Sequence, residues 1–188
     1  GAGVAERTLD GWKAREAKAG RVYNCASQSI GGFPFGIEAR CLDASAELKT
    51  NQPPLVVKGR GMLVSAELWR PTVLTTEFSA PLTVAQPGQQ PFVTVNWQYA
   101  RTVLHGLPTA PESAAIHMDR PVVDRDGGEN VFKAERADLN ARLVSGTVKD
   151  NPVIESVIKL VAASAQTLHP AAAIPLDADV TMVVRGLK

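Results

Sequence analysis

The chain has 188 residues, of which 45% are hydrophobic, and its formal net charge is +1. This length is typical of one large domain that buries a core without needing a metal or a partner to fold. The balanced charge argues against a nucleic-acid-binding protein, which usually carries a strongly basic patch. No run approaches the roughly 18 continuous apolar residues of a transmembrane helix.

Residues 4–19 favour a helix. Ala5, Leu9 and Trp12 recur at helical spacing and form one narrow apolar stripe, and Gly20 is suited to end the helix. A stripe this thin predicts either a helix that rests on a sheet edge or the end of a longer helix from a membrane anchor. The sequence does not begin with Met, and a secretory segment removed before Gly1 is compatible with it.

Cys25 and Cys41 flank the most turn-like peptide of this region, Gly31-Gly32-Phe33-Pro34-Phe35. The segments on either side are long enough for strands, so a chain reversal at Phe33 would place the two cysteines opposite each other in a hairpin. Opposed residues have the Cβ spacing that a disulfide uses. We predict a disulfide and therefore an exported protein; the alternative is two buried thiols in a cytosolic protein.

Most of the remaining chain favours strands. Extended segments rich in Val and Thr lie at 54–68, 71–84, 92–99, 114–118, 131–143 and 177–185. In the third of these, Val93, Val95, Trp97 and Tyr99 alternate on one face. Asp126-Gly127-Gly128 predicts a turn. Because strand follows strand without regular helices between them, we expect an antiparallel sheet of about seven to nine strands.

Residues 152–168 favour a second helix. Asn151 is a good N-cap and Pro152 fits the first helical position. Ile154, Val157, Ile158 and Val161 then form a broad apolar helical face. The predicted fold class is therefore α+β: a curved antiparallel β-sheet with an N-terminal helix, one helix packed on its concave face, and one disulfide-linked hairpin.

The sequence contains no familiar catalytic or phosphate-binding motif. His105, His117 and His169 are far apart and share no ligand spacing, and a disulfide leaves no thiol for catalysis or zinc. We therefore predict no catalytic residues, no metal site and no cofactor, hence no enzyme. Two polar segments allow two interpretations each. The acidic residues at 119, 124, 126 and 129 form either a solvated loop or a calcium site. Residues 58–61 (KGRG) form either a bulged strand or a phosphate-binding site.

Two groups of apolar residues are candidates for a binding site. Phe33 and Phe35 at the hairpin tip either close one end of the core, or touch lipid and guard the mouth of a groove. The predicted second helix either covers the sheet or contributes Ile154, Val157, Ile158 and Val161 as one wall of a hydrophobic cleft, a common design of small-molecule sites.

The motifs Gly11-Trp12, Arg15-Glu16-Ala17, Gly20-Arg21, Tyr23, Cys25, Gly31 to Phe35 and Cys41 together resemble the domain of unknown function 2125 family, exported proteins found mainly in alphaproteobacteria. The resemblance implies export and no known activity. Family members are usually longer, so the chain is expected to be a short member or the N-terminal part of a longer protein. A more distant architectural similarity is to AsmA-like envelope proteins, whose curved sheets form lipid grooves.

These observations predict a single β-rich domain over residues 1–188 in the periplasm or cell envelope, close to the membrane. The predicted function is non-enzymatic binding of a lipid or other hydrophobic small molecule. The alternative is an envelope scaffold that binds another envelope protein through an exposed strand edge. No nucleic-acid partner is expected.

Overall fold

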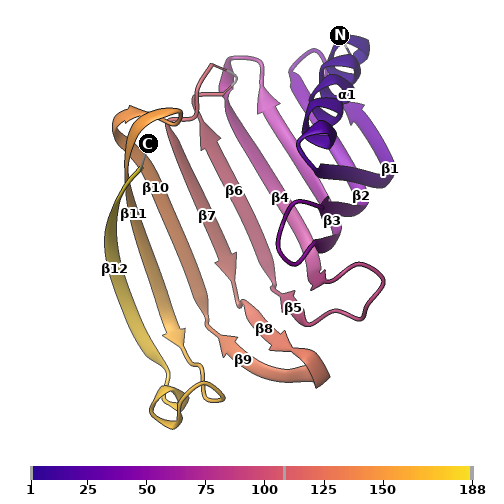
Figure 1. Cartoon of the computed structure of the whole chain (residues 1–188). Coiled ribbons are helices and arrows are strands. Elements are labelled where there is room, and N and C mark those ends of the chain that lie inside the picture. The colour runs from indigo at the N-terminus through magenta and orange to yellow at the C-terminus, as the bar shows by residue number, and fades with distance from the viewer. Residues whose placement is uncertain (1, 108, 187–188) are drawn as a thin grey trace.

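The computed structural model describes residues 2–107 and 109–186. Within this part of the chain there are one α-helix, α1 (Ala2–Lys18), and twelve strands in a single open, curved sheet (Figure 1). The strands are β1 (Arg21–Gly31), β2 (Gly36–Leu48), β3 (Leu55–Glu67), β4 (Arg70–Ala85), β5 (Val93–Asn96), β6 (Tyr99–His105), β7 (Ser113–Asp119), β8 (Val122–Arg125), β9 (Glu129–Lys133), β10 (Arg136–Thr147), β11 (Asp150–Ala163) and β12 (Leu176–Arg185). No helix of the described residues is long and apolar enough to cross a membrane.

The sheet is antiparallel and curved, as predicted. Its order is β1-β2-β3-β4-β6-β7-β10-β11-β12, and β5, β8 and β9 form a short branch beside β4. The described strands outnumber the predicted seven to nine partly because two predicted strands each contain two. The segment 92–99 breaks between Asn96 and Tyr99, and the segment 131–143 breaks between Lys133 and Arg136.

The predicted N-terminal helix is confirmed as α1, which lies on one face of the sheet at its β1–β3 end (Figure 1). The Trp12 ring stacks on Tyr23 of β1, with ring centroids 5.0 Å apart. After Gly20, whose φ of +88° suits the reversal, Arg21 returns to α1 and donates to both carboxylate oxygens of Glu16, at 2.9 and 2.6 Å. A ring stack and a bidentate ion pair therefore fix α1 to the first strand.

The predicted second helix is wrong: residues 150–163 form strand β11, between β10 and β12. Asn151 does not cap a helix but lies at the start of β11, directly after the turn, with φ of +48°. A run of apolar residues places hydrophobic side chains at helical and at strand spacing alike. The β-branched Val and Ile residues that dominate this run favour the strand. The described part of the chain therefore has no helix over the middle of the sheet.

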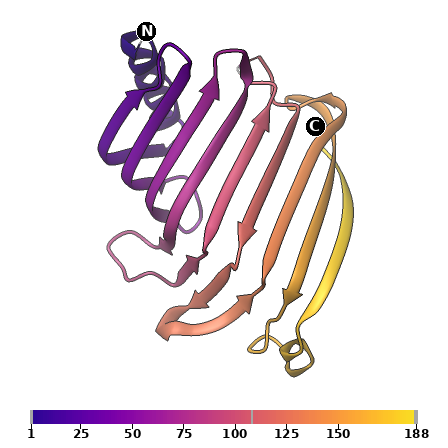
Figure 2. The same cartoon turned by 180° about the vertical axis from the view of Figure 1, so that it is seen from behind.

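The two faces of the sheet differ sharply in chemistry, because side chains alternate along every strand. On the face that carries α1, one row across six neighbouring strands is apolar: Phe78, Ala100, Met118, Ala137, Leu160 and Ala178. The adjacent row points to the opposite face and consists of ionisable side chains, here named the charged row: Glu77, Arg101, His117, Asp138, Lys159 and Asp179. Figure 2 shows this opposite face, which no described element covers.

The sheet has almost no enclosed core. Among the described residues, the buried hydrophobic side chains are Cys41, Ala100 and Ala134. The accessible surface is 12296 Å², whereas a compact monomer of this mass exposes about 8700 Å². The apolar face is therefore mostly open to solvent, instead of packing against a second layer as in most domains.

Candidate functional site

A cleft of about 360 Å³ lies between α1 and the first strands of the sheet. The helix contributes Leu9 and Trp12, and the strands contribute apolar side chains from β1 to β4. The main apolar residues of the lining are Leu9, Trp12, Tyr23, Cys25, Cys41, Ala44, Ala46, Val57, Met62, Val64, Phe78 and Leu82. A partly open, largely apolar cleft of this size is suited to hold a hydrophobic chain.

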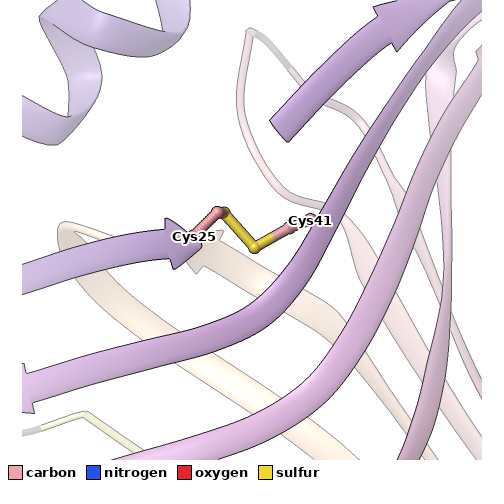
Figure 3. The surroundings of a disulfide bond; sticks show 2 residues. All are labelled: Cys25 and Cys41. Carbon is pink, nitrogen blue, oxygen red and sulfur yellow. A yellow bond between two sulfur atoms is a disulfide. The ribbon is translucent and has the colours of Figure 1, made fainter. Parts of the chain in front are cut away.

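The floor of the cleft contains the predicted disulfide, Cys25–Cys41, with Cα atoms 5.4 Å apart (Figure 3). The predicted direct opposition of the two cysteines is wrong, since Cys25 is paired with Ala44, and Cys41 with Gln28. The ladder is interrupted between these pairs, where Asp43 has φ of +50°, and β2 curves strongly past Cys41 (Figure 3). The disulfide thus joins two strands where they bend.

A glycine of β3, Gly59, leaves room above this floor. The register between β3 and β4 shifts between the pairs Gly59–Leu82 and Gly61–Ser79. The extra residue lies on β4, so the bulge expected in the KGRG segment is on the neighbouring strand instead. A Cβ placed on Gly59 would meet no heavy atom within 4 Å, although the residue lines the cleft. Part of the volume of the cleft is therefore present because a side chain is missing at this position.

The polar groups beside the cleft are engaged in holding α1. The hydrogen bonds from Arg21 lower the pKa of the Glu16 carboxyl below its ordinary value, with smaller contributions from the charge of Arg21 and the Tyr23 hydroxyl. The Tyr23 hydroxyl donates to Glu16 Oε1 at 3.2 Å. Burial, followed by the charge of Glu16, raises the pKa of Tyr23, so this phenol stays neutral. These groups orient the helix, and the cleft itself presents mainly carbon.

The apolar surface continues from the cleft toward the other end of the sheet. Beyond Phe78, a second row on the same face runs through Thr102, Ile116, Leu139, Ile158 and Val180. Ile116 remains 38% exposed in the middle of the sheet. The short branch extends the face at its lower edge through Leu82, Val95, Val123 and Phe132. The cleft is therefore the covered end of a long apolar surface.

The four residues predicted as a cleft wall are divided between the two faces. Ile154 and Ile158 alternate with Val157 and Val161 along β11, so the first pair lies on the α1 side and the second pair on the opposite side. All four lie on a strand seven places away from β1 in the sheet order. They do not form one wall, and none is among the described residues that line the cleft.

Phe33 and Phe35 are the tip of the β1–β2 hairpin, 69% and 74% exposed. The neighbouring β3–β4 turn places Leu68 beside them, since the Leu68 amide donates to the Phe35 carbonyl at 3.0 Å. Neither phenylalanine is among the described residues of the cleft lining. The tip thus protrudes at one end of the strands, away from Ile154 and its neighbours.

Sequence reasoning missed the charged row of the opposite face. Its centre is His117, whose Nδ1 lies 2.6 Å from Asp138 and whose Nε2 lies 3.0 Å from Asp119. These residues are brought together by the pairing of β7 with β10. The alternation of charged with apolar residues along each strand was visible in the sequence, but the register that aligns the charges was not.

The remaining polar residues are distributed in separate contacts. His169 accepts from the Ala171 amide and caps the short 3-10 helix at Pro170–Ala173. Of the four acidic residues considered for calcium, Asp119 contacts His117 and Glu129 pairs with Arg125. Among the described residues no group of three His, Cys, Asp or Glu side chains is placed to hold a metal ion.

Comparison with known proteins supports the resemblance noted in the sequence. No curated protein and no solved structure matches the chain significantly. A family model matches residues 1–188, and its description is an uncharacterized protein conserved in bacteria, DUF2125. With the whole chain covered by this model, the protein belongs to the DUF2125 family.

Proposed function

We propose that this protein binds a lipid or a similar hydrophobic molecule, without catalysing a reaction on it, at the membrane-facing side of the bacterial periplasm. The observation that carries the proposal is the apolar cleft beneath α1, which opens onto an apolar sheet face that no described element covers beyond α1. Water contacts this face in the free protein, and covering it with hydrocarbon is favourable at about 25 cal/mol per Å².

The division between the two faces supports a ligand on one side only. The face opposite α1 carries the charged row centred on His117 and is suited to water. The α1 face carries hydrophobic side chains over several strands. Exposed apolar patches of this extent usually mark an interaction site.

The disulfide supports the proposed compartment. Disulfides persist in oxidising compartments such as the periplasm and are rare in the bacterial cytosol. Cys25–Cys41 is compatible with export, and the proposed localisation is tested by recovering the protein from a periplasmic extract with this bond intact.

The central experiment is native mass spectrometry of protein purified without detergent. We expect an adduct of lipid mass, which organic extraction releases in a stoichiometric amount. A clean mass of the chain alone, unchanged after incubation with vesicles of bacterial phospholipid, would overturn lipid binding. The apolar face would then be assigned to a protein partner, as in the scaffold alternative.

Filling the cleft gives a sharper test. Gly59→Phe places a ring in the open volume of the cleft, and it should remove the adduct. Gly31→Phe is the matched control, because a Cβ at Gly31 also meets no heavy atom within 4 Å but the residue is outside the cleft lining. Equal lipid loading of the two variants would place the ligand elsewhere.

A second pair of variants measures how far the ligand surface extends. Ile158→Asp introduces a charge on the α1 face, whereas Val157→Asp introduces the same charge one residue away on the opposite face. A ligand that covers the open end of the sheet should be lost only from Ile158→Asp. Retention by both variants would confine the ligand to the cleft beneath α1.

A further inference from the structure

The strand β12 is an open edge of the sheet formed by the described residues. It pairs with β11 along one side, and along its other side it has no partner among the described strands (Figure 1). Its pairing with β11 is regular from Ala178 to Arg185. Proteins usually protect such an edge with a lysine, a proline, a bulge or a covering element. The ten residues of β12 contain no lysine or proline, and α1 lies at the other end of the sheet.

The outer strand is also unusually apolar for an edge in contact with water. On the α1 face Val180, Met182 and Val184 are 46%, 43% and 55% exposed. On the opposite face Val183 is 56% exposed. A strand with free backbone groups and apolar side chains on both faces is suited to pair with another strand.

The charges of β12 indicate that its pairing partner is β12 of a second copy of the chain. Asp179 and Arg185 lie at equal distance from Met182, three residues before it and three after it. If two copies of β12 pair antiparallel with Met182 opposite Met182, Asp179 of each copy lies opposite Arg185 of the other. Opposite charges at directly opposed positions stabilise an antiparallel pair. Neither residue forms an ion pair within the described part of the chain.

The same register matches the apolar residues. Val180 of each copy lies opposite Val184 of the other, and Thr181 lies opposite Val183. The charged pairs and Val183 lie on the face opposite α1, and the valine and methionine pairs lie on the α1 face. Both sets of contacts are therefore satisfied by one register.

From this self-complementarity we propose that two copies of the chain associate edge to edge through β12, with Met182 on the two-fold axis. The axis is perpendicular to the sheet, so both apolar faces are on the same side and join into one continuous surface. The two α1 helices lie at the distant ends. The interface is isologous, as closed dimers require, and it forms whether or not a lipid is bound.

Charge reversal tests the register. The wild-type chain should form a dimer in native mass spectrometry and in light scattering at low ionic strength. Asp179→Arg alone, or Arg185→Asp alone, opposes like charges at both ends of the interface and should weaken the dimer about tenfold or more. The double variant restores both ion pairs and should dimerise again.

Mixing gives the decisive result. Asp179→Arg chains present arginine at both positions and Arg185→Asp chains present aspartate at both, so the two variants should form a heterodimer although each alone dissociates. Circular dichroism of each variant checks that the sheet is intact. A monomeric wild-type chain, or dimers that all charge variants leave unchanged, would overturn the proposal.

Crosslinking provides a test without charge changes. A cysteine introduced by Met182→Cys meets its symmetry mate and should be joined by a short thiol-reactive crosslinker. A cysteine from Thr181→Cys lies opposite Val183 and should be joined much less. Equal crosslinking at the two positions would show that β12 is not paired in this register.

Discussion

The two ends of the sheet are built from the same antiparallel ladder, but a helix covers the apolar face at only one of them in the described chain. At the β1–β3 end, α1 covers the apolar face, Trp12 stacks on Tyr23 and a disulfide joins β1 to β2. At the β10–β12 end the same face continues without a covering element in the described chain. The helix and the disulfide therefore belong to the end that contains the cleft, and the described strands at the other end are ordered without either.

This difference predicts where the free energy of unfolding is concentrated. Replacing both cysteines, Cys25→Ser and Cys41→Ser, should lower it by about 3 kcal/mol, because the bond closes a loop of about 15 residues. Urea unfolding measures the change. Hydrogen exchange should show the largest loss of protection in β1 and β2, and equal loss in β11 would contradict a stability concentrated at the covered end.

Truncating apolar side chains should separate the two ends more finely. Met62→Ala removes a side chain from beneath α1 and should cost about 2 kcal/mol, at the lower limit for core truncations. Ile116→Ala removes one from the open face and should cost less than about 1 kcal/mol, because water already reaches it. Equal costs would show that the open face is as well packed as the cleft.

The contact between α1 and the sheet should contribute less to stability than the side chain of Met62. Trp12→Ala removes the stack on Tyr23 and should cost about 1 kcal/mol, since Trp12 is itself partly exposed. The expected structural effect is local, with faster amide exchange in α1 and unchanged exchange from β6 onward. Loss of protection throughout the sheet would show that α1 is needed for the whole fold.

The smallest expected effect is a pH dependence confined to α1. Arg21 lowers the pKa of Glu16 below its ordinary value of 4.5 in the folded chain. The contribution of this pair is therefore complete above about pH 4.5 and disappears as the pH falls through the lower, folded-state pKa. Amide exchange in α1 should rise in that acid range, and Glu16→Gln should abolish the dependence while exchange in β10 and β11 remains unaffected.

Much of the covered end was predictable from sequence, because its signals are local. Trp12 and Gly20 marked the helix, and the glycines and proline around Phe33 marked the hairpin that the disulfide joins. The exact pairing of Cys25 was not predictable, since it depends on the irregularity at Asp43 and on the curvature of the strands.

The open end was predicted poorly for a general reason. The run from Val153 to Val161 fits both a helix and a strand by spacing. Its β-branched residues favour the strand, and its pairing with β10 and β12 fixes it as one. The alignment of His117 with Asp138 follows from the register of β7 and β10. Register is a long-range property, and a single sequence specifies it only through the packing of the whole sheet.

The scarcity of enclosed side chains has a consequence for the lifetime of the protein in the cell. Under the proposed function, a lipid present at one hundred times its dissociation constant would add about 2.7 kcal/mol to the free energy of unfolding. Proteolysis that acts on the opened chain would slow by about the same factor of one hundred. The cellular abundance of the protein would then rise and fall with the supply of its lipid. Degradation, rather than synthesis alone, would adjust the amount of protein to the amount of lipid.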